Sequence, residues 1–289
     1  MPLRRSFLYM PATDWRKIKK AATELRPDSI CMDLEDGVAL SRKAEARTTA
    51  VQALKELDFG SAERLVRINA TDTDLAFDDL EAVLPAQPDG IVVPKVRSGN
   101  HIQVLHEKLA TAEHKYGFPG GSLKLLLIIE SARGVILLDE IYKASSRIQA
   151  LIFGAEDYSA DIGAIRSPAG LEVLWARTKV VAYARSIGVD AIDIVYPNFR
   201  DPQGFLRQAK EGLGFGYTGK QLIHPDQIDL IHQVYRPAEE EIQKARRIVE
   251  AYAAHQAGGT GAFALDGHMV DMPVVRQAKL VLDRAGVNQ

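Results

Sequence analysis

Two apolar runs in the middle of the chain each lead into a carboxylate. The first, residues 125–129, ends directly at Glu130, and the second, residues 151–155, runs into Glu156 and Asp157. Such runs are typical of strands buried on both faces of a parallel sheet, and ligands bind where these strands end. Two such carboxylates, without histidine or cysteine beside them, form an all-oxygen site suited to Mg²⁺. The sequence therefore predicts that Glu130 and Asp157 bind this metal; the alternative is that each acid only caps the helix after it.

A third candidate for chemistry is Arg67, which lies within the run 65–68. Because side chains alternate along a strand and both neighbours are apolar, we expect the guanidinium on the interior face or rim of the fold. A buried arginine needs an opposing charge, which either Glu130 or a carboxylate of the substrate could supply. We interpret Arg67 as a ligand-binding residue, with a purely structural ion pair as the alternative.

Eight short apolar runs recur along the chain between segments with helical spacing. They are residues 7–10, 30–32, 65–68, 91–94, 125–129, 151–153, 191–196 and 221–224. Capping residues precede several helical segments, among them Asp14 or Thr13 for the first and Ser41 for the second. Strands that alternate with helices indicate parallel βαβ units, and eight units in succession predict an α/β fold of the (β/α)₈ TIM-barrel type. Catalytic residues of such barrels lie at the C-terminal strand ends.

The chain changes character after the eighth run. A strongly charged helix is expected from Pro237, followed by the glycine-rich stretch 258–261, a short hairpin and a final helix from Pro273. A piece of this size is too small to fold alone, so it must dock on the barrel or on a neighbouring subunit. We therefore predict a catalytic barrel domain over residues 1–235 and a C-terminal helical and hairpin cap over residues 236–289.

Composition excludes several classes of partner. The chain has 36 Lys and Arg against 38 Asp and Glu, a formal net charge of −2. No global field recruits nucleic acid or an anionic membrane, so we predict neither as a partner. The apolar runs are about strand length, too short to span a bilayer. The single cysteine, Cys31, is expected in the core and fits a reducing, cytoplasmic compartment.

One motif is a false match. Residues 214–220 (GFGYTGK) agree with the first seven positions of the phosphate-binding loop, but Gln221 stands where Ser or Thr should contact Mg²⁺. The segment is also expected to lead from a helix into a strand, the reverse of the order that this loop needs. We therefore do not predict nucleotide hydrolysis.

A resemblance to a known family rests on eight segments that occur in the family's order. They are LYMP (8–11), MDLEDGV (32–38), VRIN (66–69), VPKV (93–96), IESA (129–132), GAEDY (154–158), YPNFRD (196–201) and GKQLIHP (219–225). They resemble the citrate lyase beta subunit/malyl-CoA lyase superfamily, also described as the HpcH/HpaI aldolase/citrate lyase family. The tail, residues 261–273, is similar to that of the citramalyl-CoA lyase-like members, which carry a C-terminal cap.

The resemblance implies a role for each residue that matches a family motif. Glu130 and Asp157 match the residues that hold Mg²⁺, and Arg67 matches an arginine that contacts the substrate near its thioester. Asp271, in the cap, matches an aspartate that acts as acid or base in a neighbouring subunit's site. The residues that the resemblance places near the CoA part of the substrate are Tyr9, Arg16, Lys20, Gln221 and Leu222.

The implied activity is that of a Mg²⁺-dependent lyase. It cleaves a 3-hydroxyacyl-CoA thioester, such as (S)-citramalyl-CoA or malyl-CoA, into acetyl-CoA and pyruvate or glyoxylate, and it runs backwards as a malate-synthase-like Claisen condensation. A cap that serves a neighbour needs a closed ring, so we expect a homotrimer or a larger assembly of trimers. Two alternatives stay open: the beta subunit of a citrate lyase complex, acting on a citryl thioester, and a non-catalytic barrel that binds a CoA ester. One methyl group changes binding by only about 1–3 kcal/mol, so the acyl group is not predicted.

Overall fold

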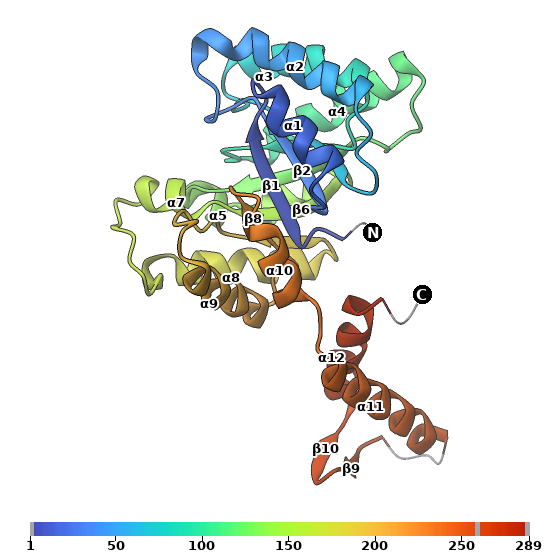
Figure 1. The fold of residues 1–289 in the computed structure, drawn as a ribbon. Coiled ribbons are helices and arrows are strands. Elements are labelled where there is room, and N and C mark those ends of the chain that lie inside the picture. The colour runs from blue at the N-terminus through green and yellow to red at the C-terminus, as the bar shows by residue number, and fades with distance from the viewer. Residues whose placement is uncertain (1–2, 258–260, 287–289) are drawn as a thin grey trace. The chain divides into compact units, whose positions relative to one another are not determined.

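The computed structural model describes residues 3–257 and 261–286. The chain divides into two compact units, Met1–Ile231 and His232–Gln289, and Figure 1 labels many of their helices and strands. This division falls inside a helix, shortly before the predicted boundary after residue 235. No helix in the described part of the chain combines the length and the apolar character needed to cross a bilayer.

In the described part of the first unit, eight parallel strands close into a barrel in sequential order. They are β1 (Ser6–Pro11), β2 (Ser29–Asp33), β3 (Glu63–Arg67), β4 (Gly90–Val93), β5 (Lys124–Ile129), β6 (Ile148–Phe153), β7 (Asp190–Asp193) and β8 (Gly219–Leu222). Strand β8 pairs with β1, so the sheet has no free edge. The predicted TIM barrel is confirmed.

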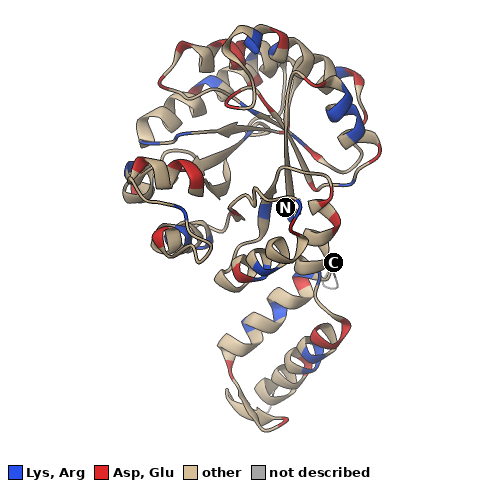
Figure 2. Ribbon diagram, turned by 60° about the vertical axis from the view of Figure 1, so that its left-hand side comes forward, with Lys and Arg blue, Asp and Glu red and all other residues tan. Residues whose placement is uncertain are grey.

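Helices surround this barrel. They are α1 (Trp15–Thr23), α2 (Lys43–Glu56), α3 (Asp74–Val83), α4 (Gly99–Tyr116), α5 (Ala132–Ile136), α6 (Leu138–Lys143), α7 (Ala155–Asp161), α8 (Leu171–Ser186), α9 (Pro202–Phe215) and α10 (Gln227–Tyr235). Figure 2 shows the charged residues mainly on helices and loops, with the strands mostly uncharged. Inside the barrel, apolar side chains from most strands form one cluster, and Cys31 is fully buried in it, as expected of a core residue.

Helix starts agree only in part with the predicted caps. Asp14 accepts a hydrogen bond from a backbone N–H in the first turn of α1 (3.1 Å), so it is the expected cap. Ser41 was predicted to cap the second helix but lies inside a short 3₁₀ turn, and α2 begins at Lys43. The Lys43 ammonium donates to the carbonyl oxygen of Leu34 (2.7 Å), and this anchor lies at the first residue of the helix.

Strands β7 and β8 both end earlier than the sequence predicted, because the apolar runs continue to Tyr196 and His224. The buried side chain of Gln227 accounts for the difference. Its amide oxygen accepts from the backbone N–H groups of Ile223 (3.0 Å) and His224 (3.3 Å). Its amide nitrogen donates to the carbonyl of Tyr196 (3.1 Å). A side chain thus satisfies backbone groups that a neighbouring strand would otherwise pair.

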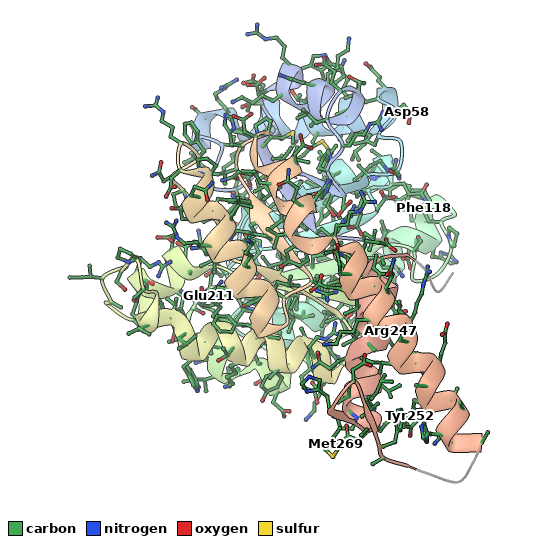
Figure 3. All side chains as sticks on the ribbon, turned by 60° about the horizontal axis from the view of Figure 1, so that its bottom comes forward. Asp58, Phe118, Glu211, Arg247, Tyr252 and Met269 are labelled. Atoms are coloured by element: carbon green, nitrogen blue, oxygen red, sulfur yellow. The ribbon has the colours of Figure 1, made fainter. Side chains whose placement is uncertain are left out.

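The second unit contains α11 (Glu239–Ala257), the strands β9 (Phe263–Leu265) and β10 (His268–Val270), and α12 (Met272–Arg284). The hairpin turns at Asp266 and Gly267, whose φ angles of 52° and 77° suit a type I′ turn. Tyr252 is buried in the core of this unit, whereas Met269 on the hairpin is 69 % exposed (both labelled in Figure 3). The predicted hairpin and its two flanking helices are confirmed, and residues 258–260 of the glycine-rich stretch lie outside the described residues.

Gly219 provides a test of barrel closure. A Cβ atom there would lie 1.8 Å from the backbone carbonyl oxygen of Arg4, which leads into β1. We expect Gly219→Ala to lower the free energy of unfolding by about 3 kcal/mol or more, or to prevent folding, because the β1–β8 contact must open. Gly214→Ala, in α9 with open space around it, should be neutral or stabilise by up to about 1 kcal/mol. Denaturant unfolding compares the two, and equal stabilities would contradict this account.

Candidate active site

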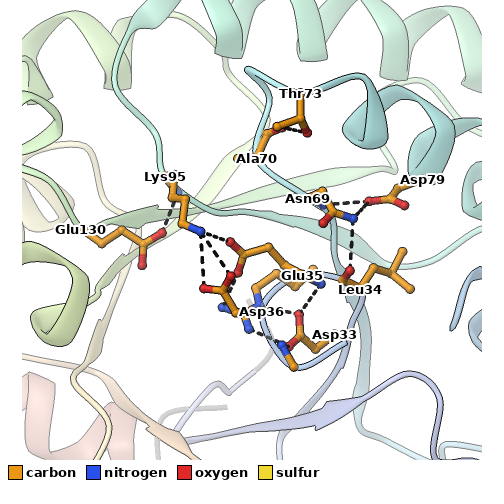
Figure 4. A network of polar contacts seen from close by, with 12 residues as sticks. Asp33, Leu34, Glu35, Asp36, Asn69, Ala70, Thr73, Asp79, Lys95 and Glu130 are labelled. Atoms are coloured by element: carbon orange, nitrogen blue, oxygen red, sulfur yellow. Dashed lines mark hydrogen bonds and ion pairs between the residues drawn. The ribbon is translucent and has the colours of Figure 1, made fainter. Parts of the chain in front are cut away.

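Charged residues gather at the C-terminal ends of strands β2 to β5. Asp33 ends β2, Arg67 ends β3, Lys95 follows β4 and Glu130 follows β5. Figure 4 shows a network of polar contacts that connects the loop after β2 with Lys95 and Glu130. The parallel pairing of neighbouring strands brings these positions to one end of the barrel.

Arg67 is held by two acids and one aromatic ring. Its Nε and Nη2 atoms donate to the two carboxylate oxygens of Asp33 at 2.7 and 2.6 Å. Its Nη1 atom lies 3.1 Å from Oε2 of Glu35, and the guanidinium sits 5.2 Å from the ring centroid of Tyr9. Burial alone would lower the pKa of Arg67, but the hydrogen bonds and charge of Asp33 raise it well above its usual value.

The partner of Arg67 therefore differs from the one predicted. The sequence offered Glu130 or a substrate carboxylate, whereas the structure pairs the arginine with Asp33 and Glu35. The reason is strand register: Asp33 and Arg67 are direct partners in the β2–β3 pairing. Glu130 follows β5, which is two strands away from β3.

Glu130 is a buried carboxylate, with 5 % of its surface exposed. Its Oε1 atom accepts a hydrogen bond from the backbone N–H of Lys95 (2.6 Å). Gly154 makes room for the other oxygen, because a Cβ atom there would lie 2.6 Å from Oε2. Burial, together with the negative charge of Asp157, raises the pKa of Glu130 to about 8. The site therefore disfavours the charged carboxylate unless a positive charge is added.

Neither acid of the predicted pair caps the helix that follows it. Ser131 caps α5 with its side chain, and Gly154 is the N-cap of α7. Asp157 lies in the first turn of α7 and is exposed, and its charge acts on Glu130. Among the described residues, no group of three or more His, Cys, Asp or Glu side chains is arranged around one point. A cation held by Glu130 and Asp157 would complete its shell with water or substrate oxygens, which fits the oxygen preference of Mg²⁺.

A cavity of about 280 Å³ opens beside Arg67. Tyr9, Gln221 and Ile223 are among its lining residues. The Tyr9 hydroxyl is buried and has no hydrogen-bond partner in the described part of the chain. Burial raises the pKa of this phenol well above its usual value, so the hydroxyl keeps its proton and can donate to a ligand oxygen.

The predicted CoA-binding residues at β8 are both buried. The Gln221 amide nitrogen donates to the carbonyl oxygens of Phe153 (2.9 Å) and Asp193 (3.1 Å), which ties the ends of β6 and β7 together. Gln221 also lines the cavity beside Arg67. The side chain of Leu222 is completely buried in the barrel wall.

Besides Tyr9, which lines the inner cavity, two more of the predicted CoA-binding residues lie on the surface of α1. Arg16 and Lys20 are both exposed there. Arg16 lines a second cavity, of about 530 Å³, together with Lys17 and Arg42. Lys20 follows one turn later on α1 and does not line this cavity.

Asp271 belongs to the second unit, where it is the N-cap of α12. Its carboxylate accepts a hydrogen bond from the backbone N–H of Val274 (3.3 Å) and stays partly exposed. The neighbouring side chains of Met269 and Met272 are exposed apolar groups.

Most of the chain, including the barrel that carries most of these residues, matches a known protein family. The sequence matches the HpcH/HpaI aldolase/citrate lyase family over residues 5–225. The chain belongs to this family.

Named relatives agree with this membership. The chain is 39 % identical to the mitochondrial citramalyl-CoA lyase of Homo sapiens, over 96 % of this chain and 84 % of that one. It is 37 % identical to the citrate lyase subunit beta of Haemophilus influenzae, over 99 % and 98 % of the two chains. Because these relatives are named lyases and the family is of the aldolase and lyase type, this family member is an enzyme of the lyase type.

A solved structure matches almost the whole chain. It is CitE from Mycobacterium tuberculosis in complex with magnesium, acetoacetate and coenzyme A. It matches with a TM-score of 0.81 and 31 % identity, over 98 % of each chain.

Sequence reasoning gave no role to three residues of the network. Asp33 and Glu35 orient Arg67, and Lys95 contacts Glu130. The feature of the sequence that points to them is a run of acids at the end of the second apolar run, together with a basic residue near the end of the third run and one just after the fourth. The sequence alone does not show which acid pairs with which base.

The raised pKa of Glu130 predicts a pH-dependent stability. This carboxyl loses its proton near its ordinary pKa of 4.5 in the unfolded chain but at about 8 in the folded protein. Between these values the folded state binds more protons, so the free energy of unfolding should fall as pH rises, by at most about 1.4 kcal/mol per pH unit from this group. Glu130→Gln cannot ionise and should flatten the slope. Denaturant unfolding at several pH values, in buffers that contain a chelator, measures this slope. Equal slopes for the wild type and Glu130→Gln would refute the raised pKa of Glu130.

Proposed function

We propose that this enzyme is a Mg²⁺-dependent carbon–carbon lyase acting on a 3-hydroxyacyl-CoA thioester such as (S)-citramalyl-CoA or malyl-CoA. Its products would be acetyl-CoA and an α-keto acid, pyruvate or glyoxylate, and the reverse condensation would use the same groups. The observation that carries the proposal is that the carboxylates of Glu130 and Asp157, whose charges interact, lie at the same barrel end as the cavity lined by Arg67. The relative named citramalyl-CoA lyase and the CitE complex with magnesium and coenzyme A support it.

Glu130 and Asp157 are the residues proposed to hold the metal. Both offer carboxylate oxygens, and burial of Glu130 beside a second negative charge makes an added cation favourable. When bound, Mg²⁺ supplies Lewis-acid polarisation of the substrate oxygens that become the keto acid. Gly154 contributes by leaving space for the Glu130 carboxylate.

Arg67 is proposed to stabilise the charge that develops during cleavage. The substrate hydroxyl passes its proton to a base, for which we propose the Asp271 carboxylate, its oxygen becomes the keto oxygen, and the carbon–carbon bond breaks. The bonding electrons move onto the thioester as the enolate of acetyl-CoA. A guanidinium fixed by Asp33 and Glu35 can meet this negative oxygen without reorganising. A proton must then reach the enolate carbon, and Asp271 is the proposed donor.

The CoA part of the substrate needs cations for its phosphates. We propose that Arg16 and Lys20 of α1 supply them, supported by the exposed position of both and by the cavity that Arg16 lines with Lys17 and Arg42. Tyr9 and Gln221 would contact the thioester end, since both line the inner cavity. Leu222 could contribute only its backbone, because its side chain is completely buried.

A second candidate is the beta subunit of a citrate lyase complex, acting on a citryl thioester. The 37 % identity to the subunit of Haemophilus influenzae, over nearly the full length of both chains, favours it. In this candidate the thioester would be attached to another subunit of the complex and not to free CoA. The proposed role of Arg67 in stabilising the enolate would be the same. The basic residues around the second cavity suit a phosphate-bearing carrier of either kind, and the cleavage assay distinguishes the two.

We also propose a cytoplasmic location and no nucleic-acid or membrane partner. A reducing, cytoplasmic compartment is supported by the single, buried Cys31, whereas the human relative is named as mitochondrial. The net charge of −2 gives no support to a nucleic-acid or membrane partner.

A thioester-cleavage assay decides between these functions. The purified protein would be given (S)-citramalyl-CoA, malyl-CoA and a citryl thioester, each with Mg²⁺ and with excess chelator. We expect cleavage of at least one CoA ester that stops on chelation, because the carboxylate pair alone provides no electrophile. Glu130→Ala and Asp157→Ala should each lower the rate at least about 100-fold while keeping the wild-type circular dichroism spectrum. Turnover that survives exhaustive chelation would refute the metal assignment.

The proposed assembly is a homotrimer or a multiple of trimers. Asp271 lies in the second unit among exposed apolar side chains, Met269 and Met272, which suit a contact with a neighbour. We propose that this unit closes over the site of an adjacent copy and delivers Asp271 there. A head-to-tail contact of this kind must close into a ring to avoid a filament.

Mixed oligomers test whether the site is shared. Asp271→Ala and Glu130→Ala subunits should each be inactive alone. Mixed, they should recover a substantial fraction of wild-type activity, because some sites combine an intact Glu130 with an intact Asp271 from a neighbour. Native mass spectrometry of tagged subunits verifies mixing and counts the subunits. Mixed oligomers that stay inactive would mean that Asp271 acts within its own chain.

A further inference from the structure

Lys95 has an unusual backbone for a residue with a large side chain. Its φ angle is 52°, in the left-handed region, which among the described non-glycine residues is shared only with Gln87 and Asp266. A Cβ atom makes this conformation unfavourable, and it persists only where the surroundings enforce it. Lys95 directly follows Pro94, after the end of β4, and is partly buried.

The two ends of Lys95 contact two different parts of the site. Its backbone N–H donates to Oε1 of Glu130 at 2.6 Å. Its ammonium lies 2.5 Å from Oε1 of Glu35 and 3.3 Å from Oδ1 of Asp36, in the loop after β2. Figure 4 shows both sets of contacts. A single residue therefore links the proposed metal-binding carboxylate to the acidic loop that orients Arg67.

The ammonium contact explains how the left-handed backbone is held. Glu35 is 3 % exposed, and its carboxylate makes ion pairs with Lys95 and Arg67. A buried carboxylate between two cations strongly resists loss of either one, because a buried charge is costly without partners. The Lys95 side chain is thus anchored at its tip, and this anchor restrains the backbone from which it extends.

We propose that Lys95 is a positioning residue for the metal site. Its anchored side chain enforces the left-handed backbone, the backbone directs its N–H to Oε1 of Glu130, and this bond presents Oε2 for the cation. The inference rests on the proposed function, since it assigns Lys95 a task toward a metal held by Glu130 and Asp157. Lys95 acts through its backbone geometry; its positive charge opposes cation binding.

Two substitutions separate backbone geometry from charge. Lys95→Met and Lys95→Gly both remove the ammonium, but only glycine adopts the left-handed region without strain. If geometry matters, Lys95→Met should bind Mg²⁺ at least about tenfold more weakly than the wild type, and Lys95→Gly should stay within about threefold of it. If only charge or general packing matters, the two variants should shift together. Gln87→Gly, at another left-handed residue before β4, is the matched control and should not change Mg²⁺ affinity.

The measurement is calorimetric titration of Mg²⁺ into each metal-free, full-length protein, with crystal structures of the metal-free variants beside it. The crystal structures should keep the hydrogen bond from residue 95 to Glu130 in the wild type and in Lys95→Gly, and should lose it in Lys95→Met. Equal Mg²⁺ affinities for the two variants, or an intact hydrogen bond in Lys95→Met, would overturn the inference. A wild type that binds no Mg²⁺ would refute the proposed function instead, and the structures would still decide the role of Lys95.

Discussion

The balance of charge at the C-terminal end of the barrel is the constraint on which the site depends. Carboxylates from the β2 loop, from β5 and from α7 outnumber the two cations that contact them, Arg67 and Lys95. Both cations form ion pairs with acids at the end of β2 and just after it, Asp33 and Glu35. The Glu130 carboxylate therefore accepts from a backbone N–H instead. Burial is the main cause of the raised pKa of Glu130, and the negative charge of Asp157 adds to it. The hydrogen bonds and ion pairs around these residues hold their charged groups in fixed positions.

The barrel supplies that arrangement through backbone geometry. Register places Asp33 beside Arg67, so the two-pronged ion pair needs no unusual loop. Two glycines leave space for the carboxylates. A Cβ atom at Gly37 would lie 2.4 Å from Oδ2 of Asp33, and one at Gly154 would lie 2.6 Å from Oε2 of Glu130. The Gly37 N–H also donates to Asp33 (2.9 Å), which fixes the carboxylate that fixes Arg67. The carboxylates of Asp33 and Glu130 are therefore each held by a backbone N–H, and Asp33 in turn holds Arg67.

The sequence predicted the barrel well because buried parallel strands form apolar runs that are separated by amphipathic helices. It predicted the end of β8 poorly, because Gln227 takes over backbone bonds that an apolar pattern cannot reveal. Arg67 was recognised from its apolar neighbours, yet its partner was not, since strand register depends on the closed barrel as a whole. The role of Lys95 was hidden for a similar reason: a left-handed φ at a lysine has no sequence signature.

The central claim is that Glu130 and Asp157 together hold one divalent cation beside the cavity that Arg67 lines. Mn²⁺ takes oxygen ligands like those of Mg²⁺ and is visible by its anomalous scattering. Crystals grown with Mn²⁺ should show one strong anomalous peak per chain, within about 2.5 Å of a carboxylate oxygen of both residues. A peak elsewhere in the barrel, or none at Glu130 in a protein that cleaves its substrate, would contradict the account.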